Sequence, residues 1–151
     1  MFPTGRMTQL YSVPAAGGKA VQVLATPAQS ISVAPDASLM VYQDVKGMEN
    51  EWRKHHVSSV TRDIWSYDPA TGRHVNLTNR PGEDRDPRLD AATGTVYMIS
   101  EPAGGTMNVY SFPLSRPTEL TRLTDFDTHP VRFLSRADNG ILAFTYDGEI
   151  Y

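Results

Sequence analysis

The sequence contains no cysteine among its 151 residues. Disulfide bonds, thiolate nucleophiles and cysteine-ligated zinc sites are therefore excluded. Long apolar runs are missing as well: no stretch approaches the ~20 residues of a membrane-spanning helix, so we expect no membrane insertion. The first six residues, Met-Phe-Pro-Thr-Gly-Arg, hold no apolar segment of a secretory leader, which leaves two alternatives: a protein that is not secreted, or one whose leader has been removed.

A large excess of charge of one sign is also absent. The chain has 14 basic and 17 acidic residues and a formal net charge of −3. This balance gives no general attraction to nucleic acid or to an anionic membrane surface, so we expect neither as a partner. A helical apolar stripe is missing too: the window from Gly47 to Ser59 lacks a clear 3.6-residue period, and we interpret it as an inserted loop.

Motifs for catalysis and metal binding are not found. There is no Gly-x-Ser-x-Gly sequence, and no spacing of His, Asp and Glu matches a known zinc pattern. The adjacent pair His55 and His56 would point to opposite faces of a strand, which disfavours a shared metal. We therefore expect no catalytic residue, no metal, no cofactor and no enzymatic activity in this chain. A propeller enzyme acting on sugars or peptides, using carboxylates near Gly82 to Asp86, is kept as the weakest alternative.

What the sequence does contain is an internal repeat. A short strand ending in an aromatic residue recurs at Tyr11, Trp65, Tyr110 and Tyr151. Around it recur a second strand, a segment with proline and a further apolar strand, joined by turns rich in Gly, Asp, Asn and Ala. Four strands in a period of about 40–45 residues are typical of a β-propeller, in which we expect the repeated aromatics to pack between blades.

The predicted fold class is therefore all-β: an incomplete β-propeller of about three four-stranded antiparallel blades. Residues 1–26 would form the last two strands of a split blade, and residues 27–79 a blade with an inserted loop at 44–62. Residues 80–124 would form the next blade, and residues 125–151 two strands and the start of a third. Both ends fall inside a blade, so the sequence predicts a piece of a longer propeller. The split blade could also be completed between two chains, which would give a homo-oligomer.

One segment resembles a known family. The run from Trp52 to Trp65, with Tyr67-Asp68, Thr71-Gly72, Leu77-Thr78, Gly82 to Arg85 and Pro87, resembles the N-terminal propeller of tricorn-protease-like serine peptidases. This resemblance implies a non-catalytic module that gates or binds peptide or protein substrates of a peptidase domain elsewhere in the parent chain. The repeats also resemble those of the Tol-system periplasmic propeller protein, which implies the alternative of a scaffold for protein–protein interaction. The compartment stays open; the periplasm is favoured over the cytoplasm.

The candidate binding residues lie in the inserted loop: Trp52, Arg53, Lys54, His55, His56 and Arg62. Loops on rigid scaffolds often carry binding function, and Arg and Trp are enriched at binding hot spots. Such a patch could bind an acidic side chain or the terminal carboxylate of a peptide through charge-assisted hydrogen bonds. The alternatives are a solvated loop, or a pairing of Arg62 with Asp63 inside the blade. The expected partners are a peptide or protein substrate and the remainder of the parent chain.

Overall fold

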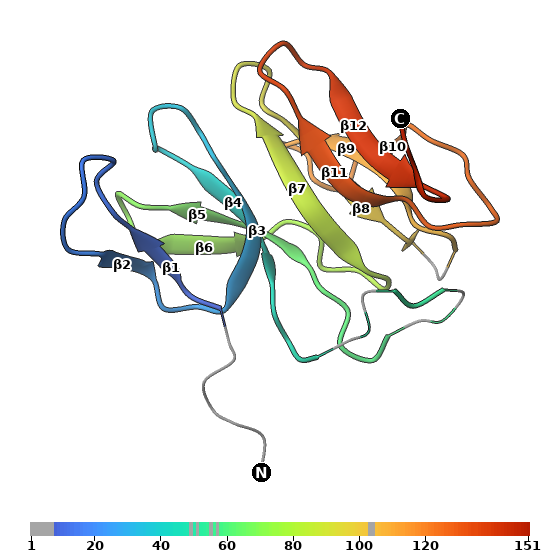
Figure 1. Cartoon of the computed structure of the whole chain (residues 1–151), viewed down its shortest axis with the longest axis horizontal. Coiled ribbons are helices and arrows are strands. Elements are labelled where there is room, and N and C mark those ends of the chain that lie inside the picture. The colour runs from blue at the N-terminus through green and yellow to red at the C-terminus, as the bar shows by residue number, and fades with distance from the viewer. Residues whose placement is uncertain (1–7, 49, 51, 55, 57, 103–104) are drawn as a thin grey trace.

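The computed structural model describes residues 8–48, 50, 52–54, 56, 58–102 and 105–151. These residues form thirteen β-strands and no α-helix. The described part of the chain therefore holds no helix that is long and apolar enough to cross a membrane. The strands are arranged in four separate antiparallel sheets that follow one another along the chain (Figure 1). The all-β prediction is confirmed.

Two sheets have four strands and two are incomplete. Blade 1 consists of β3 (Ala28–Val33), β4 (Met40–Asp44), β5 (Ile64–Asp68) and β6 (Arg73–Asn76). Blade 2 consists of β7 (Asp84–Asp90), β8 (Thr95–Ser100), β9 (Asn108–Pro113) and β10 (Thr121–Arg122). They are preceded by the pair β1 (Leu10–Ser12) and β2 (Val21–Leu24), and followed by blade 3, which is β11 (Arg132–Arg136), β12 (Leu142–Tyr146) and β13 (Glu149–Ile150). Strands within each sheet pair in sequence order, and this is the architecture of an incomplete β-propeller.

The first strand of each of these three blades, β3, β7 and β11, carries a β-bulge at the same place. Its pairing with the next strand shifts register there, and one residue adopts a left-handed backbone: Ser30 (φ 48°), Asp86 (φ 52°) and Phe133 (φ 55°). Three unlike side chains share this conformation, so the sheet imposes it and the side chain does not. Neighbouring bulges also touch, since Ser30 Oγ donates to Asp86 Oδ1 at 2.8 Å.

The core lies between the blades. Alternation along β8 directs Val96 and Met98 toward blade 1 and Ile99 toward blade 3, and all three are fully buried. The blade 1–blade 2 interface contains Ala34, Val41, Ile64, Leu89, Val96, Met98, Tyr110 and Phe112. The blade 2–blade 3 interface contains Ile99, Met107, Val109, Val131 and Leu134.

The repeated aromatics differ in burial. Tyr110 is buried and Trp65 half-buried, but Tyr11 and Tyr151 are 52% and 57% exposed. The expectation of shared packing was wrong for this last pair. Tyr11 and Tyr151 belong to the incomplete sheets, which lack a neighbouring blade to cover them.

Candidate functional site

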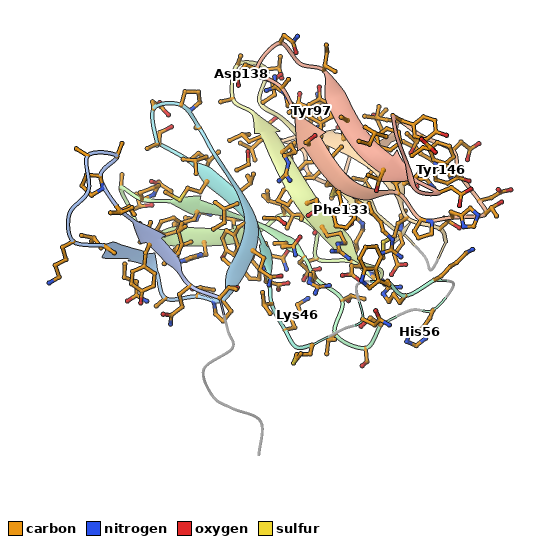
Figure 2. The ribbon with its side chains drawn as sticks, viewed as in Figure 1. Lys46, His56, Tyr97, Phe133, Asp138 and Tyr146 are labelled. Carbon is orange, nitrogen blue, oxygen red and sulfur yellow. The ribbon has the colours of Figure 1, made fainter. Side chains whose placement is uncertain are left out.

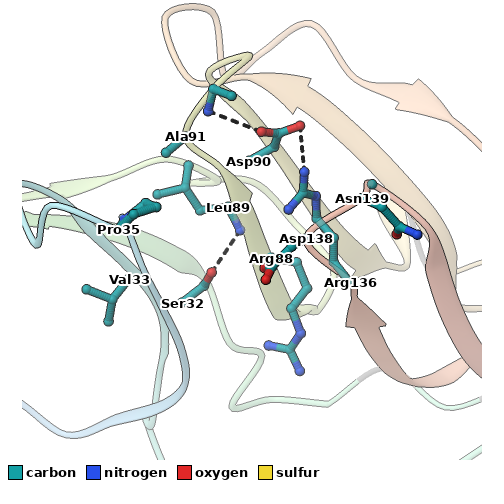
Figure 3. A pocket seen from close by; sticks show the side chains of 12 residues that line it. Ser32, Val33, Pro35, Arg88, Leu89, Asp90, Ala91, Arg136, Asp138 and Asn139 are labelled. Atoms are coloured by element: carbon teal, nitrogen blue, oxygen red, sulfur yellow. Dashed lines mark hydrogen bonds and ion pairs between the residues drawn. The ribbon is translucent and has the colours of Figure 1, made fainter.

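One pocket lies where the inner strands of the three blades end, next to the turns that lead to their second strands. Its volume is about 580 Å³, and β3, β7 and β11 all contribute to its wall (Figure 3). We call it the channel-end pocket and define it by Ser32, Arg88, Leu89, Asp90, Arg136 and Asp138. In a complete propeller the blades surround a central channel, and the name refers to the place of this cavity at the ends of the inner strands.

Two contacts fix the wall of the channel-end pocket. Ser32 Oγ accepts a hydrogen bond from the backbone N–H of Leu89 at 3.0 Å, which ties β3 to β7. An Arg136 guanidinium nitrogen lies 2.8 Å from Asp90 Oδ2, which ties β11 to β7 (Figure 3). Burial opposes ionisation of Asp90, but hydrogen bonds from Thr93 and the charge of Arg136 outweigh it and hold its pKa below the ordinary value.

Arg88 has a different environment. Its Nη1 donates to the carbonyl oxygen of Pro87 at 2.9 Å, and within the described part of the chain no carboxylate forms an ion pair with it. Since Arg136 is neutralised by Asp90, Arg88 supplies the uncompensated positive charge of this wall. Asp138, on the exposed turn after β11, is the acidic group at the pocket's rim.

The connection between β4 and β5 carries all six predicted binding residues, and it lies at the other end of the inner strands. We call its described residues between 45 and 62 the strap. Figure 2 shows Lys46 and His56 of this connection at the bottom of the molecule and Asp138 of the channel-end pocket at the top. The strap leaves blade 1, passes blade 2 and reaches blade 3, where a carbonyl oxygen of the strap, that of Arg53, accepts from Arg132 at 2.9 Å.

Two arginines of the strap are buried in an ion network. Arg53 Nη2 lies 2.5 Å from Glu83 Oε2, and Arg53 Nη1 donates to Glu101 at 3.1 Å. Arg62 pairs with the other oxygen of Glu83, and the side chain of Glu83 is only 1% exposed. Two guanidinium groups therefore face two carboxylates away from water. Arg62 thus has a carboxylate partner in blade 2, and Asp63 pairs with Lys46 at 2.7 Å.

The network also shifts the pKa values of its members. Burial raises the pKa of the Glu83 carboxyl, but hydrogen bonds from Arg53 and Arg62 outweigh it, and the net shift is downward. Burial likewise opposes the charge of Arg53, yet its bonds to Glu101 and Glu83 raise its pKa. Glu83 and Arg53 therefore stay ionised near neutral pH.

The remaining predicted residues have different positions. Trp52 is 66% exposed, and its ring lies edge-to-face on Phe133 with centroids 5.7 Å apart. Lys54 and His56 are exposed, while His55 lies outside the described residues. The burial of Arg53 and Arg62 leaves these exposed side chains as the members of the predicted set that a ligand could contact.

A second pocket, of about 430 Å³, lies between the strap and blade 3 and is called the strap pocket. Lys54 Nζ donates to His129 Nδ1 at 2.8 Å, and the other ring nitrogen lies 3.4 Å from Asp147. The Arg132 guanidinium carbon is 5.2 Å from the centre of the Trp52 ring, a cation–π distance. The sequence analysis did not single out His129, Arg132, Phe133 or Asp147. No local signal marks them, because they come from a different blade.

No group of three or more His, Asp or Glu side chains that could hold a metal occurs among the residues described. No family model matches the sequence, and no curated protein matches it. Solved structures do match. A protein assigned as TolB from Agrobacterium tumefaciens superposes with a TM-score of 0.69 over 95% of this chain and 47% of its own, at 20% identity. The fold is that of a β-propeller segment. TolB from Acinetobacter baumannii superposes with a TM-score of 0.57 over 87% of this chain and 29% of its own, at 18% identity.

This chain therefore spans less than half the length of each of these two TolB proteins. Identities of this size establish the fold and leave the activity open. Both structures are of the Tol type, and the resemblance to tricorn-protease-like peptidases is not shown by them.

Proposed function

We propose that this chain is a non-catalytic propeller segment that binds a segment of a partner protein at the channel-end pocket. The observation that carries this proposal is the position of the pocket, at the meeting point of three inner strands. Pockets of this size that combine apolar walls with a few polar groups are typical ligand sites. Rigid strands hold its lining residues, which favours recognition of one defined shape.

The wall favours an acidic partner segment. Arg88 presents a guanidinium group without a carboxylate partner among the described residues, in a pocket that the exposed apolar side chain of Val33 also lines. An aspartate or glutamate side chain of the partner could accept two hydrogen bonds from Arg88, and apolar residues beside it could contact Val33.

A scaffold for protein–protein interaction is favoured over a peptidase module because both solved structures are TolB proteins. Gating of peptides for a tricorn-like peptidase domain stays a prediction of the sequence. The sequence of the parent protein beyond residue 151 distinguishes the two: a serine-peptidase region with a PDZ-like module supports gating, and its absence supports the scaffold. Turnover of peptide or glycoside panels by this chain would instead contradict the non-catalytic assignment.

The test is a titration of ¹⁵N-labelled protein with a capped pentapeptide containing Asp and Glu beside Leu, and with its Asn and Gln counterpart. We expect chemical-shift changes confined to residues of the channel-end pocket. Arg88→Gln should lower the affinity for the acidic peptide by about tenfold. Arg73→Gln, an exposed arginine on β6, is the matched control and should leave binding unchanged. Equal binding of both peptides, or indifference to Arg88→Gln, refutes the proposal.

We further propose that the exposed residues of the strap, Trp52, Lys54 and His56, contact a carboxylate-bearing ligand at the strap pocket. The recorded partner of the Lys54 amino group is a ring nitrogen of His129, and no carboxylate is recorded against it among the described residues. Lys54→Gln should lower affinity for an acidic peptide, whereas Lys19→Gln on the exposed β1–β2 turn should not. Unchanged affinity in Lys54→Gln contradicts this assignment.

Completion of the split blade by a second copy also stays a proposal. The outer edge of β12 is occupied over Phe144 to Tyr146 by the chain's own residues 149–151. A partner's β1 would have to displace them before it could pair there. Light scattering after size exclusion should show a dimer if this exchange occurs, and a monomer mass argues against it.

A further inference from the structure

A third hollow, of about 330 Å³, lies at the boundary between the β1–β2 pair and blade 1. It is separate from the channel-end pocket and the strap pocket and shares no lining residue with either. Its wall consists of Thr26, Pro27, Tyr42, Asp44, Val45, Trp65 and His74. We call it the aromatic pocket.

The register of blade 1 explains why three rings and one carboxylate meet here. Tyr42 on β4 lies directly opposite Trp65 on β5, so the two side chains share a face of the sheet. Asp44 follows Tyr42 by two positions and therefore points to the same face. His74 on β6 is brought to this face by a hydrogen bond of 2.8 Å between its Nδ1 and the Tyr42 hydroxyl.

The carboxylate is held firmly and keeps acceptor capacity. Trp65 Nε1 donates to Asp44 Oδ2 at 3.1 Å, and the backbone N–H of Asp63 donates to Asp44 Oδ1 at 2.9 Å. A carboxylate oxygen has two lone pairs; Oδ2 also faces the Lys46 ammonium at 3.6 Å, whereas Oδ1 can accept one more hydrogen bond. The bond from the indole nitrogen also orients the Trp65 ring, which is half-buried and lines the pocket.

The local charge is negative. The carboxylates of Asp44 and Asp63 are accompanied by one cation, Lys46, which lies 3.6 Å from Asp44 and 2.7 Å from Asp63. Burial raises the pKa of Asp44, as expected for a carboxylate in a partly dry site. Burial, followed by the charge of Asp44, raises the pKa of Tyr42 to about 12, so the phenol stays neutral at working pH.

We propose that the aromatic pocket binds the alkylammonium group of a lysine side chain from a protein partner. Aromatic faces attract a cation within ~6 Å, and Trp is the best of them. Asp44 supplies the counter-charge and an acceptor for the ammonium N–H groups. The apolar parts of Pro27 and Val45 can cover the four-carbon stem. An anionic group would be repelled by the carboxylate of Asp44, so it should not bind. This site is independent of the acidic segment proposed for Arg88.

The test uses Trp65 fluorescence in a Trp52→Phe background, which leaves Trp65 as the single tryptophan. The probes are n-butylammonium, its neutral counterpart 1-butanol, and N-acetyl-lysine methylamide as the side chain of a protein. We expect saturable changes with n-butylammonium and the lysine derivative and none with 1-butanol. Binding should weaken as the pH falls and Asp44 takes up its proton. Equal responses to n-butylammonium and 1-butanol refute a cation site. Binding of n-butylammonium without the lysine derivative refutes a lysine side chain as the occupant.

Two variants change the affinity in opposite directions. Asp44→Asn should weaken n-butylammonium binding about tenfold, because the counter-charge is lost. Lys46→Gln should strengthen it about threefold, because a competing cation is removed. Lys46 is 41% exposed, so this second variant should fold even if Asp44→Asn does not. Asp68→Asn, a half-buried carboxylate outside the pocket whose hydrogen bonds go to Ala70 and Thr71 of its own turn, is the control and should leave the affinity unchanged. No change in affinity with Lys46→Gln contradicts the proposal.

Discussion

Replacement of Glu83 by alanine tests the role of the buried ion network. Glu83 accepts hydrogen bonds from Arg53 Nε at 3.2 Å and Nη2 at 2.5 Å, and also pairs with Arg62. Its removal would leave two buried guanidinium groups with only Glu101 as a counter-charge among the members of the network. Breaking a buried pair in this way costs about 3–5 kcal/mol, a large part of the ~5–15 kcal/mol that stabilises a typical domain.

The assay is urea unfolding followed by circular dichroism at neutral pH. The matched control is Glu119→Ala, which breaks an ion pair with Arg116 whose two side chains are 63% and 53% exposed. This control should cost less than about 0.5 kcal/mol. Because the pKa of Glu83 is lowered, its stabilisation is present above the pKa of an unfolded glutamate and lost as pH falls through the folded value. The difference between wild type and Glu83→Ala should therefore shrink in acid. A cost below about 1 kcal/mol at neutral pH would refute the argument.

Three further predictions concern other parts of the molecule. Burial raises the pKa of Asp84 to about 6. Its contribution to the free energy of unfolding is therefore fully present below the pKa of an unfolded aspartate and is lost as the pH rises through about 6. Asp84→Asn should remove this pH dependence, which is measured as the difference between the urea midpoints at about pH 5 and about pH 8. A difference in the variant as large as that in wild type would contradict the prediction. Gly82→Ala should destabilise the fold strongly, because a Cβ there would lie 2.3 Å from a backbone carbonyl oxygen at a φ of +102°. Gly94→Ala, at a φ of +67° with open space around it, should cost only about 1 kcal/mol by the same measurement. Trp52→Ala should loosen the strap and raise hydrogen exchange at the β11 amides, and unchanged exchange would show that the strap does not depend on this ring.

The sequence predicted the all-β fold class because its signals are local. Turns such as Asp36-Ala37-Ser38, in which Asp36 Oδ1 accepts from the Ser38 amide at 3.0 Å, mark each hairpin. Hydrophobic alternation along strands such as β8 then orients the core. Both signals depend on residues close together in the chain, which makes them visible without a structure.

The site was less predictable because it depends on distant partners. Arg53 lies in a basic run typical of a solvated loop, yet its partners Glu83 and Glu101 are 30 and 48 residues away. The channel-end pocket draws on strands from three blades, and no spacing within one blade indicates that Arg136 pairs with Asp90 while Arg88 has no carboxylate partner in the described part of the chain. The expected packing of Tyr11 and Tyr151 assumed neighbouring blades that these incomplete sheets do not have.

The strap changes how the blades depend on one another. In a linear repeat array each unit touches only its nearest neighbours, so units can be lost one at a time from an end. Here a loop of blade 1 holds Glu83 and Glu101 of blade 2 and also contacts Arg132 of blade 3, a second neighbour. Blade 3 cannot unfold without breaking a contact to blade 1, and blade 2 lies between them. Under mechanical pulling from the C-terminus, the three blades should therefore unfold in one cooperative event. A simple repeat array would instead unfold in several separate steps.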